Sequence, residues 1–144
     1  MSELTTAEIA ALREALDDGY HAYSTYDQIV VDFGEVRPFI HVRSAEARHI
    51  DALLELFEHY DLEAPPNTWP ERVKHYRRVR DACADAVEAE TSTAALYDRL
   101  VASTSRPDLL AVFRRLQAAS LERHLPAFQQ CIGRPDRRHA ASAP

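Results

Sequence analysis

The stretch Glu46-Ala-Arg-His49 places two polar side chains inside an apolar stripe with helical spacing. Steps of three and four residues join the members of this stripe, which are Phe39, Val42, Glu46, His49, Leu53, Leu56 and Tyr60. This spacing describes one face of an α-helix, and an apolar face points into a core. A carboxylate and an imidazole there must be paired, neutralised or bound to a ligand. Because Glu-x-x-His on a core-facing helix is typical of metal centres in helical bundles, the stretch predicts both a bundle and a polar site within it.

Four long helical segments account for most of the chain. We expect them at about 6–33, 38–60, 79–102 and 107–132. The first begins with a capping box, since Thr5 precedes Glu8 by three positions, and Gly34 marks its end. Three prolines in residues 61–70 predict a loop, and residues 71–78 fit either a loop or a short helix. The sequence therefore predicts an all-α, antiparallel four-helix bundle over residues 1–132, with a longer connection between the second and third helices.

The composition is that of one globular domain. The chain has 144 residues, 46% hydrophobic and 28% charged, which suffices for a single core. A net charge of −6 argues against a nucleic-acid partner, and no run of about 18 apolar residues suggests a membrane span. The first residues lack the basic and apolar regions of a secretory signal, so we expect a cytoplasmic protein. The polar residues 133–144 are expected to form a disordered tail.

Two cysteines, Cys83 and Cys131, lie far apart and lack the spacing of a zinc site. In a reducing compartment we expect both to be buried as small apolar residues. A disulfide between them is the alternative.

Two later helical faces carry one further candidate ligand each. Glu90 lies within the apolar face of the third helix, and His124 within that of the fourth. With Glu46 and His49, they would supply two carboxylates and two imidazoles from three helices. A mixed oxygen and nitrogen set suits iron, manganese or zinc. The sequence therefore predicts a metal site at these four residues and assigns no catalytic residue.

Each candidate ligand also has a purely structural explanation. A single Glu-x-x-His occurs often by chance, His124 could bond to a backbone carbonyl or to Ser120, and Glu90 could pair with an arginine. Residues expected to line the same interior are Tyr23, Tyr26, Tyr97 and Ser120. The tyrosines are either core residues with satisfied hydroxyls or hydrogen-bond donors around the ligands.

The chain also shows a faint internal repeat. Tyr26 follows position 19 by seven residues, as Tyr97 follows Glu90 by seven. The core histidines that come next in the two halves are His49 and His124. Each half is therefore expected to be one long helix followed by a helix with a core histidine, which strengthens the joint assignment of the ligands.

Several segments resemble a bacterial ferritin-like family that is usually described only as a domain of unknown function. They include Ala45-Glu-Ala-Arg-His-Ile50 and Ala119-Ser-Leu-Glu-Arg-His-Leu-Pro-Ala-Phe128, with further similarity in residues 12–26, 33–39 and 82–98. The resemblance spans about residues 12–131 and implies a ferritin-like or erythrin-like bundle with a carboxylate-bridged dimetal site, most often di-iron. It matches Glu46, His49, Glu90 and His124 to metal-binding positions.

Two positions depart from that family. Gly19 replaces the carboxylate expected on the first helix, and Asp18 is rotated by about 100° from that position. A full site would also have a glutamate three residues before His124, where this chain has Leu121. A weakened dimetal site, a single-metal site and an empty pocket are therefore all open.

Three functions follow from these observations. The first is a ferritin-like, iron-binding oxidoreductase of the oxidase, peroxidase or ferroxidase type, which acts on oxygen or peroxide. The second is a non-catalytic scaffold with the same fold, and the third is a protein that stores or delivers metal without turnover. The sequence does not fix the oligomeric state, and a homodimer is one option because ferritin-like bundles often pair along a helix face.

Overall fold

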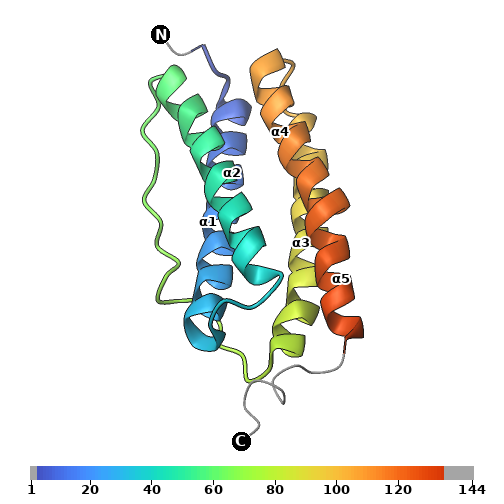
Figure 1. Ribbon diagram of the computed structural model, residues 1–144. Helices are drawn as coiled ribbons and strands as arrows, with labels where there is room; N and C mark the ends of the chain where they lie inside the picture. Colours follow the sequence, from blue (N-terminus) through green and yellow to red (C-terminus); the bar gives the residue numbers. More distant parts are fainter. Residues whose placement is uncertain (1–2, 135–144) are drawn as a thin grey trace, which may run out of the picture.

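Residues 3–134 are described by the computed structural model, in which four helical rods stand side by side (Figure 1). The rods are α1 (Thr6–Phe33), α2 (Phe39–His59), α3 (Val79–Val101) and an end-to-end run of α4 (Pro107–Ala119), the π-helical segment η1 (Ser120–His124) and α5 (Leu125–Gly133). No strand occurs within these residues. The predicted all-α four-helix bundle is confirmed, and residues 71–78 form turns and bends rather than a helix.

Both ends of α1 are fixed by the local sequence. The Thr5 hydroxyl accepts from the Glu8 N–H at 3.0 Å, and the Glu8 carboxylate accepts from the Thr5 N–H at 2.9 Å. This reciprocal pair satisfies two backbone donors that a helix start leaves without partners. At the other end Gly34 has φ 86°, a conformation that glycine adopts at little cost, and its N–H reaches Val30 O.

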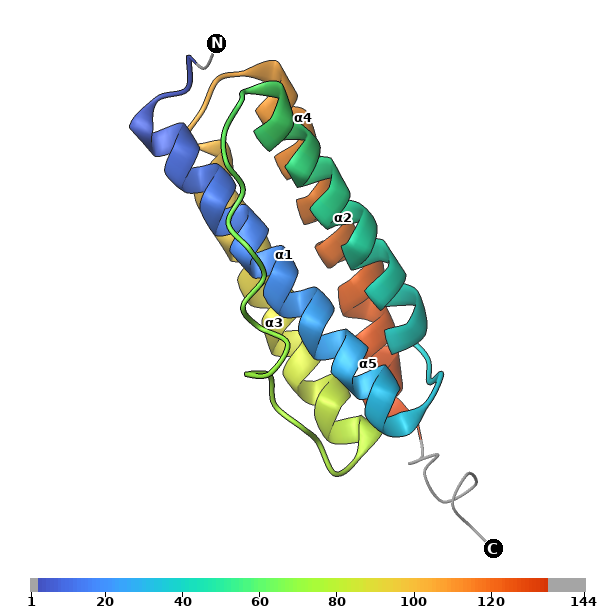
Figure 2. The ribbon, with the colours of Figure 1, turned by 90° about the vertical axis from the view of Figure 1, so that its left-hand side faces the viewer.

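The rods form two hairpins, α1–α2 and α3–α4–η1–α5, which pack against each other through α1 with α3 and α2 with α4. Neighbouring rods run antiparallel, whereas α2 and α3 point the same way (Figure 1). The connection from α2 to α3 must therefore return along the whole bundle. Residues 60–78 do this by crossing the outer face of α1 (Figure 2).

Specific contacts hold this connection to α1. The Tyr20 hydroxyl donates to Pro65 O at 3.0 Å, and the Asn67 amide donates to the Ser24 hydroxyl at 3.0 Å. The Trp69 ring stacks on the imidazole of His21 with ring centres 3.9 Å apart. These bonds satisfy polar groups of a long loop, as an ordered surface segment requires.

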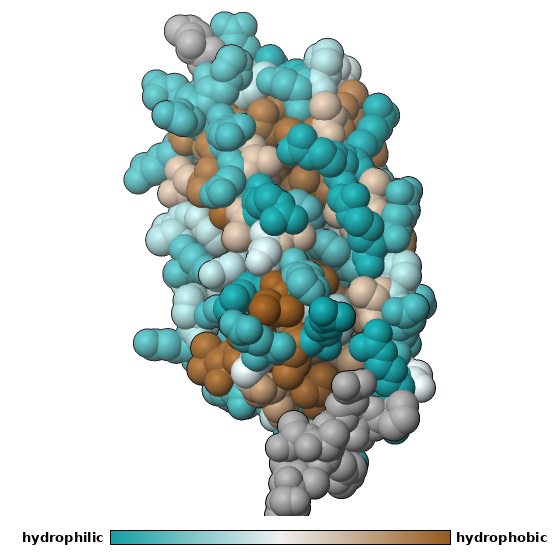
Figure 3. Space-filling view, in the orientation of Figure 1, coloured by the Kyte–Doolittle hydropathy of each residue, from teal (hydrophilic) through white to brown (hydrophobic). Residues whose placement is uncertain are grey.

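The core consists of two hydrophobic clusters. One is centred on Leu12, Leu16, Leu53, Phe57, Leu109 and Phe113, and the other on Tyr26, Ile29, Phe39, Val42, Cys83 and Phe128. Each fully buried apolar side chain contributes about 1.5–3 kcal/mol to folding. On three of the rods, buried polar residues lie between these two clusters along the sequence, and so a polar layer crosses the middle of the bundle. They are Glu46 on α2, Glu90 on α3, and Ser120 and His124 on the fourth rod. On the face shown in Figure 3, hydrophilic residues cover most of the surface, with hydrophobic residues showing between them.

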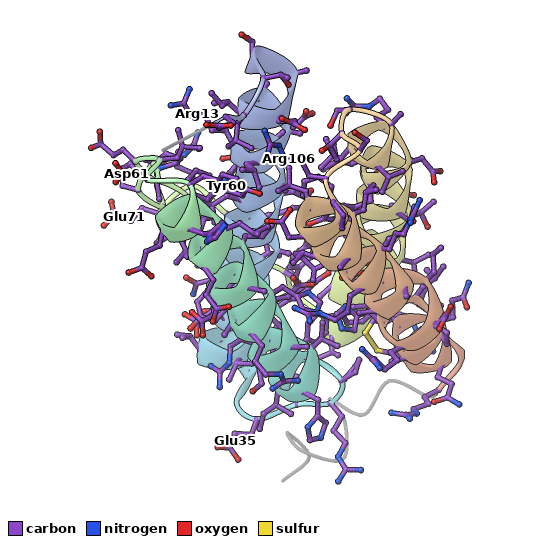
Figure 4. All side chains as sticks on the ribbon, turned by 90° about the horizontal axis from the view of Figure 1, so that it is seen from above. Arg13, Glu35, Tyr60, Asp61, Glu71 and Arg106 are labelled. Carbon is purple, nitrogen blue, oxygen red and sulfur yellow. A yellow bond between two sulfur atoms is a disulfide. The ribbon has the colours of Figure 1, made fainter. Side chains whose placement is uncertain are left out.

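A disulfide joins Cys83 on α3 to Cys131 on α5, visible as the yellow bond in Figure 4. The expectation of two reduced, independent cysteines is therefore wrong. Each cysteine lies on the inward face of its helix, and the antiparallel pairing of α3 with α5 brings their Cα atoms to 6.1 Å, within the range that a disulfide spans. The bond staples together the two rods of the second hairpin.

No helix between residues 3 and 134 is both long and apolar enough to cross a membrane. The predicted tail begins at Gly133, which instead is the last residue of α5. The rest of that prediction, residues 135–144, lies outside the described part of the chain.

Candidate metal centre

The polar layer begins on α2, where Glu46 and His49 occupy adjacent turns of one helical face. Glu46 is buried and His49 is mostly buried, with 15% of its side chain exposed. Glu46 Oε1 lies 3.4 Å from His49 Nδ1, as the i, i+3 spacing allows. The apolar stripe that predicted this face thus turns both groups inward.

From α3, Glu90 reaches the same layer and is only 2% exposed. The Tyr26 hydroxyl on α1 donates to Glu90 Oε2 at 2.7 Å. This bond, at a charge-assisted length, satisfies one carboxylate oxygen and fixes the orientation of the other. Burial, followed by the charge of Glu90, raises the pKa of the Tyr26 phenol well above its usual value, so the phenol remains a donor.

His124 comes from η1, where the helix widens by one residue. The Leu125 N–H bonds to Ser120 O, five residues back, and Pro126 follows with no N–H to donate. The helix next to Pro126 is therefore disturbed in the form of a π-helical turn. It leaves His124 and Ser120 buried, while Leu121 is 45% exposed.

The three buried groups converge from three rods. His124 Nδ1 lies 3.5 Å from Glu46 Oε2 and 3.4 Å from Glu90 Oε1. Glu46, Glu90 and His124 each offer one ligand atom, and these atoms lie within 4.8 Å of one another. Both Glu90 Oε1 and His124 Nδ1 are buried without a hydrogen-bond partner. Buried polar atoms are nearly always satisfied, so two such atoms facing each other call for an occupant or a shared proton.

A proton competes with a metal ion for the imidazole nitrogen of His124, because the pKa of this group is raised. Burial acts to lower the pKa of the His124 imidazole, but the adjacent Glu46 and Glu90 outweigh burial and raise it to about 9. Burial likewise acts to raise the pKa of Glu46, but His124 and His49 beside it lower it overall. Without a metal, His124 is therefore a cation near neutral pH, with the carboxyl groups of Glu46 and Glu90 beside it.

The two oxygens of Glu46 face different histidines, Oε1 toward His49 and Oε2 toward His124, whose rings lie 5.6 Å apart. A small cavity of about 10 Å³ adjoins Glu46 and His49, near the least volume that holds one water molecule. Asp18 and Gly19 of α1 also line it. Glu46 is thus placed between two potential ligand groups.

The structure gathers most of the residues expected around the ligands. Tyr26 contacts Glu90, while Tyr97 and Ser120 line the small cavity. Tyr23 is half-buried and lines neither the cavity nor the cluster.

The two departures from the ferritin-like pattern lie in different surroundings. Gly19 faces the cavity, and a Cβ added there would lie 3.4 Å from Ile50 Cγ1. Leu121 does not occupy the place of a missing ligand, because its side chain is 45% exposed, whereas the neighbouring Ser120 is buried.

Asp18 borders the cavity although its helical phase makes it a poor substitute for a ligand at position 19. Burial, with smaller contributions from the charges of Glu46 and Glu90, raises the pKa of its carboxyl to about 6, while the Thr93 hydroxyl acts in the opposite direction. A rotation of about 100° from position 19 turns a side chain off the central axis but keeps it within the α1–α3 interface. The α1–α3 interface borders the cavity only because of how the helices pack, and the local sequence does not predict this packing.

Comparison with protein-family models, with curated proteins and with solved structures finds no match to this chain. The assignment of the centre thus depends on its own geometry: two carboxylates and one imidazole in a buried layer, with a second imidazole beside them.

Proposed function

We propose that this protein binds a transition-metal ion in the middle of the bundle, with Glu46, Glu90 and His124 as its ligands. The observation that carries the proposal is a pair of buried atoms without hydrogen-bond partners, Glu90 Oε1 and His124 Nδ1, which face each other at 3.4 Å. Two carboxylate oxygens and an imidazole nitrogen form a donor set that suits iron, manganese or zinc. His49, facing the other oxygen of Glu46, would serve a second ion, with Glu46 between the two.

We further propose iron as the metal and a ferritin-like kinship, on the strength of the resemblance in the sequence. Bound iron would supply one-electron redox chemistry toward oxygen or peroxide, as expected of an oxidase or ferroxidase. The surrounding chain supports such a role in defined ways. Tyr26 holds Glu90 in place through its hydroxyl, and apolar clusters lie on both sides of the layer.

A non-catalytic role is the second candidate, and a specific observation favours it. With His124 protonated, the imidazolium lies between Glu46 and Glu90 and neutralises part of their charge without any metal. The cluster would then be a buried ion triad of a scaffold protein. Storage or delivery of metal without turnover would require binding but no oxidation.

Metal analysis of untagged protein, followed by anaerobic titration with ferrous iron and then exposure to oxygen, separates these functions. We expect bound metal and a ferric absorption band in the wild type. Glu90→Gln keeps the shape of the side chain and should abolish binding, whereas the matched surface variant Glu122→Gln should bind as the wild type does. Binding of ferrous iron without its oxidation would indicate storage. If the wild type takes up no iron, the non-catalytic scaffold is the function that stands.

A cytoplasmic location stays a prediction. The disulfide between Cys83 and Cys131 is more typical of an oxidising environment, although redox-active and thermophile proteins also form such bonds inside cells. Thiol trapping in intact cells, followed by mass spectrometry of the Cys83 peptide, measures its redox state directly. Mostly reduced cysteines would support the cytoplasmic location.

A further inference from the structure

A groove of about 460 Å³ lies between α1 and α3, on the side of the bundle where the end of the connecting segment passes. Its α3 wall is built largely of small residues, Ala82, Ala86 and Ala89, which keep the side chains of the two helices from filling the space. Because Ala89 and Glu88 are exposed, the groove opens to solvent. Its volume is in the range of small-ligand sites.

Two residues line both this groove and the small cavity beside the ligand cluster. They are Asp18 and Thr93, and the Thr93 hydroxyl donates to Asp18 Oδ2 at 2.8 Å. On the inner side of this hydrogen-bonded pair the cavity is lined by Glu46 and His49. This pair of side chains therefore lies between a groove open to solvent and the cavity beside the candidate centre.

The groove also has the charge to attract a cation. Its lining includes the carboxylates of Asp18, Asp85 and Glu88 and the ammonium of Lys74, which lies 3.3 Å from Asp85 and so offsets that carboxylate. The negative charge that remains raises the local concentration of cations in a cleft with low-dielectric walls. Carboxylate and hydroxyl oxygens can replace the water around a divalent ion in stages.

Resting on the proposed function, we propose that this groove is the path by which a divalent cation reaches the centre, with Asp18 as the transfer ligand at its inner end. The ion displaces the Thr93 hydroxyl from Asp18, binds the carboxylate, and passes to Glu46 on the other side. The competing path leads past His49, whose side chain is 15% exposed. The two paths differ in which substitutions slow the loading of the centre.

Stopped-flow loading with Co²⁺, followed by its visible absorption, tests the path, and occupancy at equilibrium is measured separately by metal analysis. Ala89→Trp fills the groove from an exposed position of α3. Its matched control is Ala84→Trp, which is exposed on the same helix and does not line the groove. Asp18→Asn removes the transfer ligand, and Asp51→Asn, exposed on α2, is its control.

We expect Ala89→Trp to slow loading strongly and Asp18→Asn to slow it about tenfold at low salt, within the range of electrostatic steering. Both controls should load at the wild-type rate, and Ala89→Trp should reach wild-type occupancy. Loading of Ala89→Trp and Asp18→Asn at the wild-type rate would overturn the path while the metal site stands. Absence of bound cobalt in the wild type at equilibrium would overturn the proposed function itself.

Discussion

The two hairpins each contribute one carboxylate and one imidazole to the polar layer, but they do so in different ways. In the first, Glu46 and His49 come from one regular helix. In the second, Glu90 and His124 come from two rods, and the rod with the histidine is interrupted by η1. The second hairpin is also the one stapled by a disulfide.

The repeat in the sequence is therefore not a repeat of the site. In the register of the repeat, Gly19 corresponds to Glu90, and Leu121 corresponds to Glu46. Each half therefore lacks a carboxylate at the position where the other half has one. Only the two halves together form a set of ligands, so the centre depends on how the hairpins dock.

The largest expected effect comes from removing one histidine of each hairpin in turn, in metal-free protein. His124→Ala leaves the buried Glu46 and Glu90 facing each other without a cation, which should cost about 3–5 kcal/mol of unfolding free energy. His49→Ala removes a partly exposed partner of Glu46 and should cost about 1 kcal/mol. Urea denaturation in the presence of a chelator measures both.

The exposed His41→Ala is the control for these two substitutions and should leave stability unchanged. If His49→Ala and His124→Ala lose equal amounts of unfolding free energy, the two hairpins hold their histidines in equivalent ways, and the difference between the hairpins is contradicted.

Loss of the disulfide should have the next largest effect. The bond closes a loop with a sequence separation of 48, for which loss of chain entropy predicts a stabilisation of up to about 4 kcal/mol. The double variant Cys83→Ala/Cys131→Ala should lose amide protection first in α3 and α5, as measured by hydrogen exchange. Uniform loss across all four rods would contradict a special dependence of the second hairpin on this bond.

The stability of the metal-free protein should also depend on pH. Since the pKa of His124 is raised from 6.5 to about 9 in the folded state, its stabilisation is complete below pH 6.5 and is lost as pH rises toward 9. The loss is at most about 3 kcal/mol. Urea denaturation across this pH range should show that the unfolding free energy of the wild type declines. If the unfolding free energy of His124→Ala declines with pH just as steeply, another group causes the decline.

The smallest effect is expected at Gly19. Gly19→Ala gains up to about 1 kcal/mol of helix propensity, offset by the contact of its Cβ with Ile50 at 3.4 Å. Gly19→Glu adds a carboxylate to the first hairpin at the cavity and should raise iron occupancy or the rate of ferrous oxidation above that of Gly19→Ala. If the two variants behave alike in both assays, position 19 does not reach the ion.

Local signals in the sequence predicted much of this fold. The capping box at Thr5 and the glycine at position 34 set the ends of α1 at the predicted residues, 6 and 33. The periodic apolar stripe placed Glu46 on the inner face of α2, where the structure has it. Helix ends and inward faces depend on residues a few positions apart in the chain, and so they can be predicted from one sequence.

Features that depend on distant residues could not be predicted in the same way. Cys83 and Cys131 were each expected on an inward face, but their pairing depends on how α3 aligns with α5. A proline at position 126 disturbs a helix because it has no N–H to donate, but the sequence does not show that the disturbance takes the form of a π-helical turn over Ser120–His124. Asp18 became a cavity residue only through the packing of α1 against α3.

The stack of Trp69 on His21 gives this molecule an optical probe of its own. Trp69 is the single tryptophan of the chain, and its indole N–H also donates to Asp17 of α1. His21 in turn lines the α1–α3 groove. Indole fluorescence therefore monitors the docking of the long connection and the state of the adjacent groove at once, without any added label.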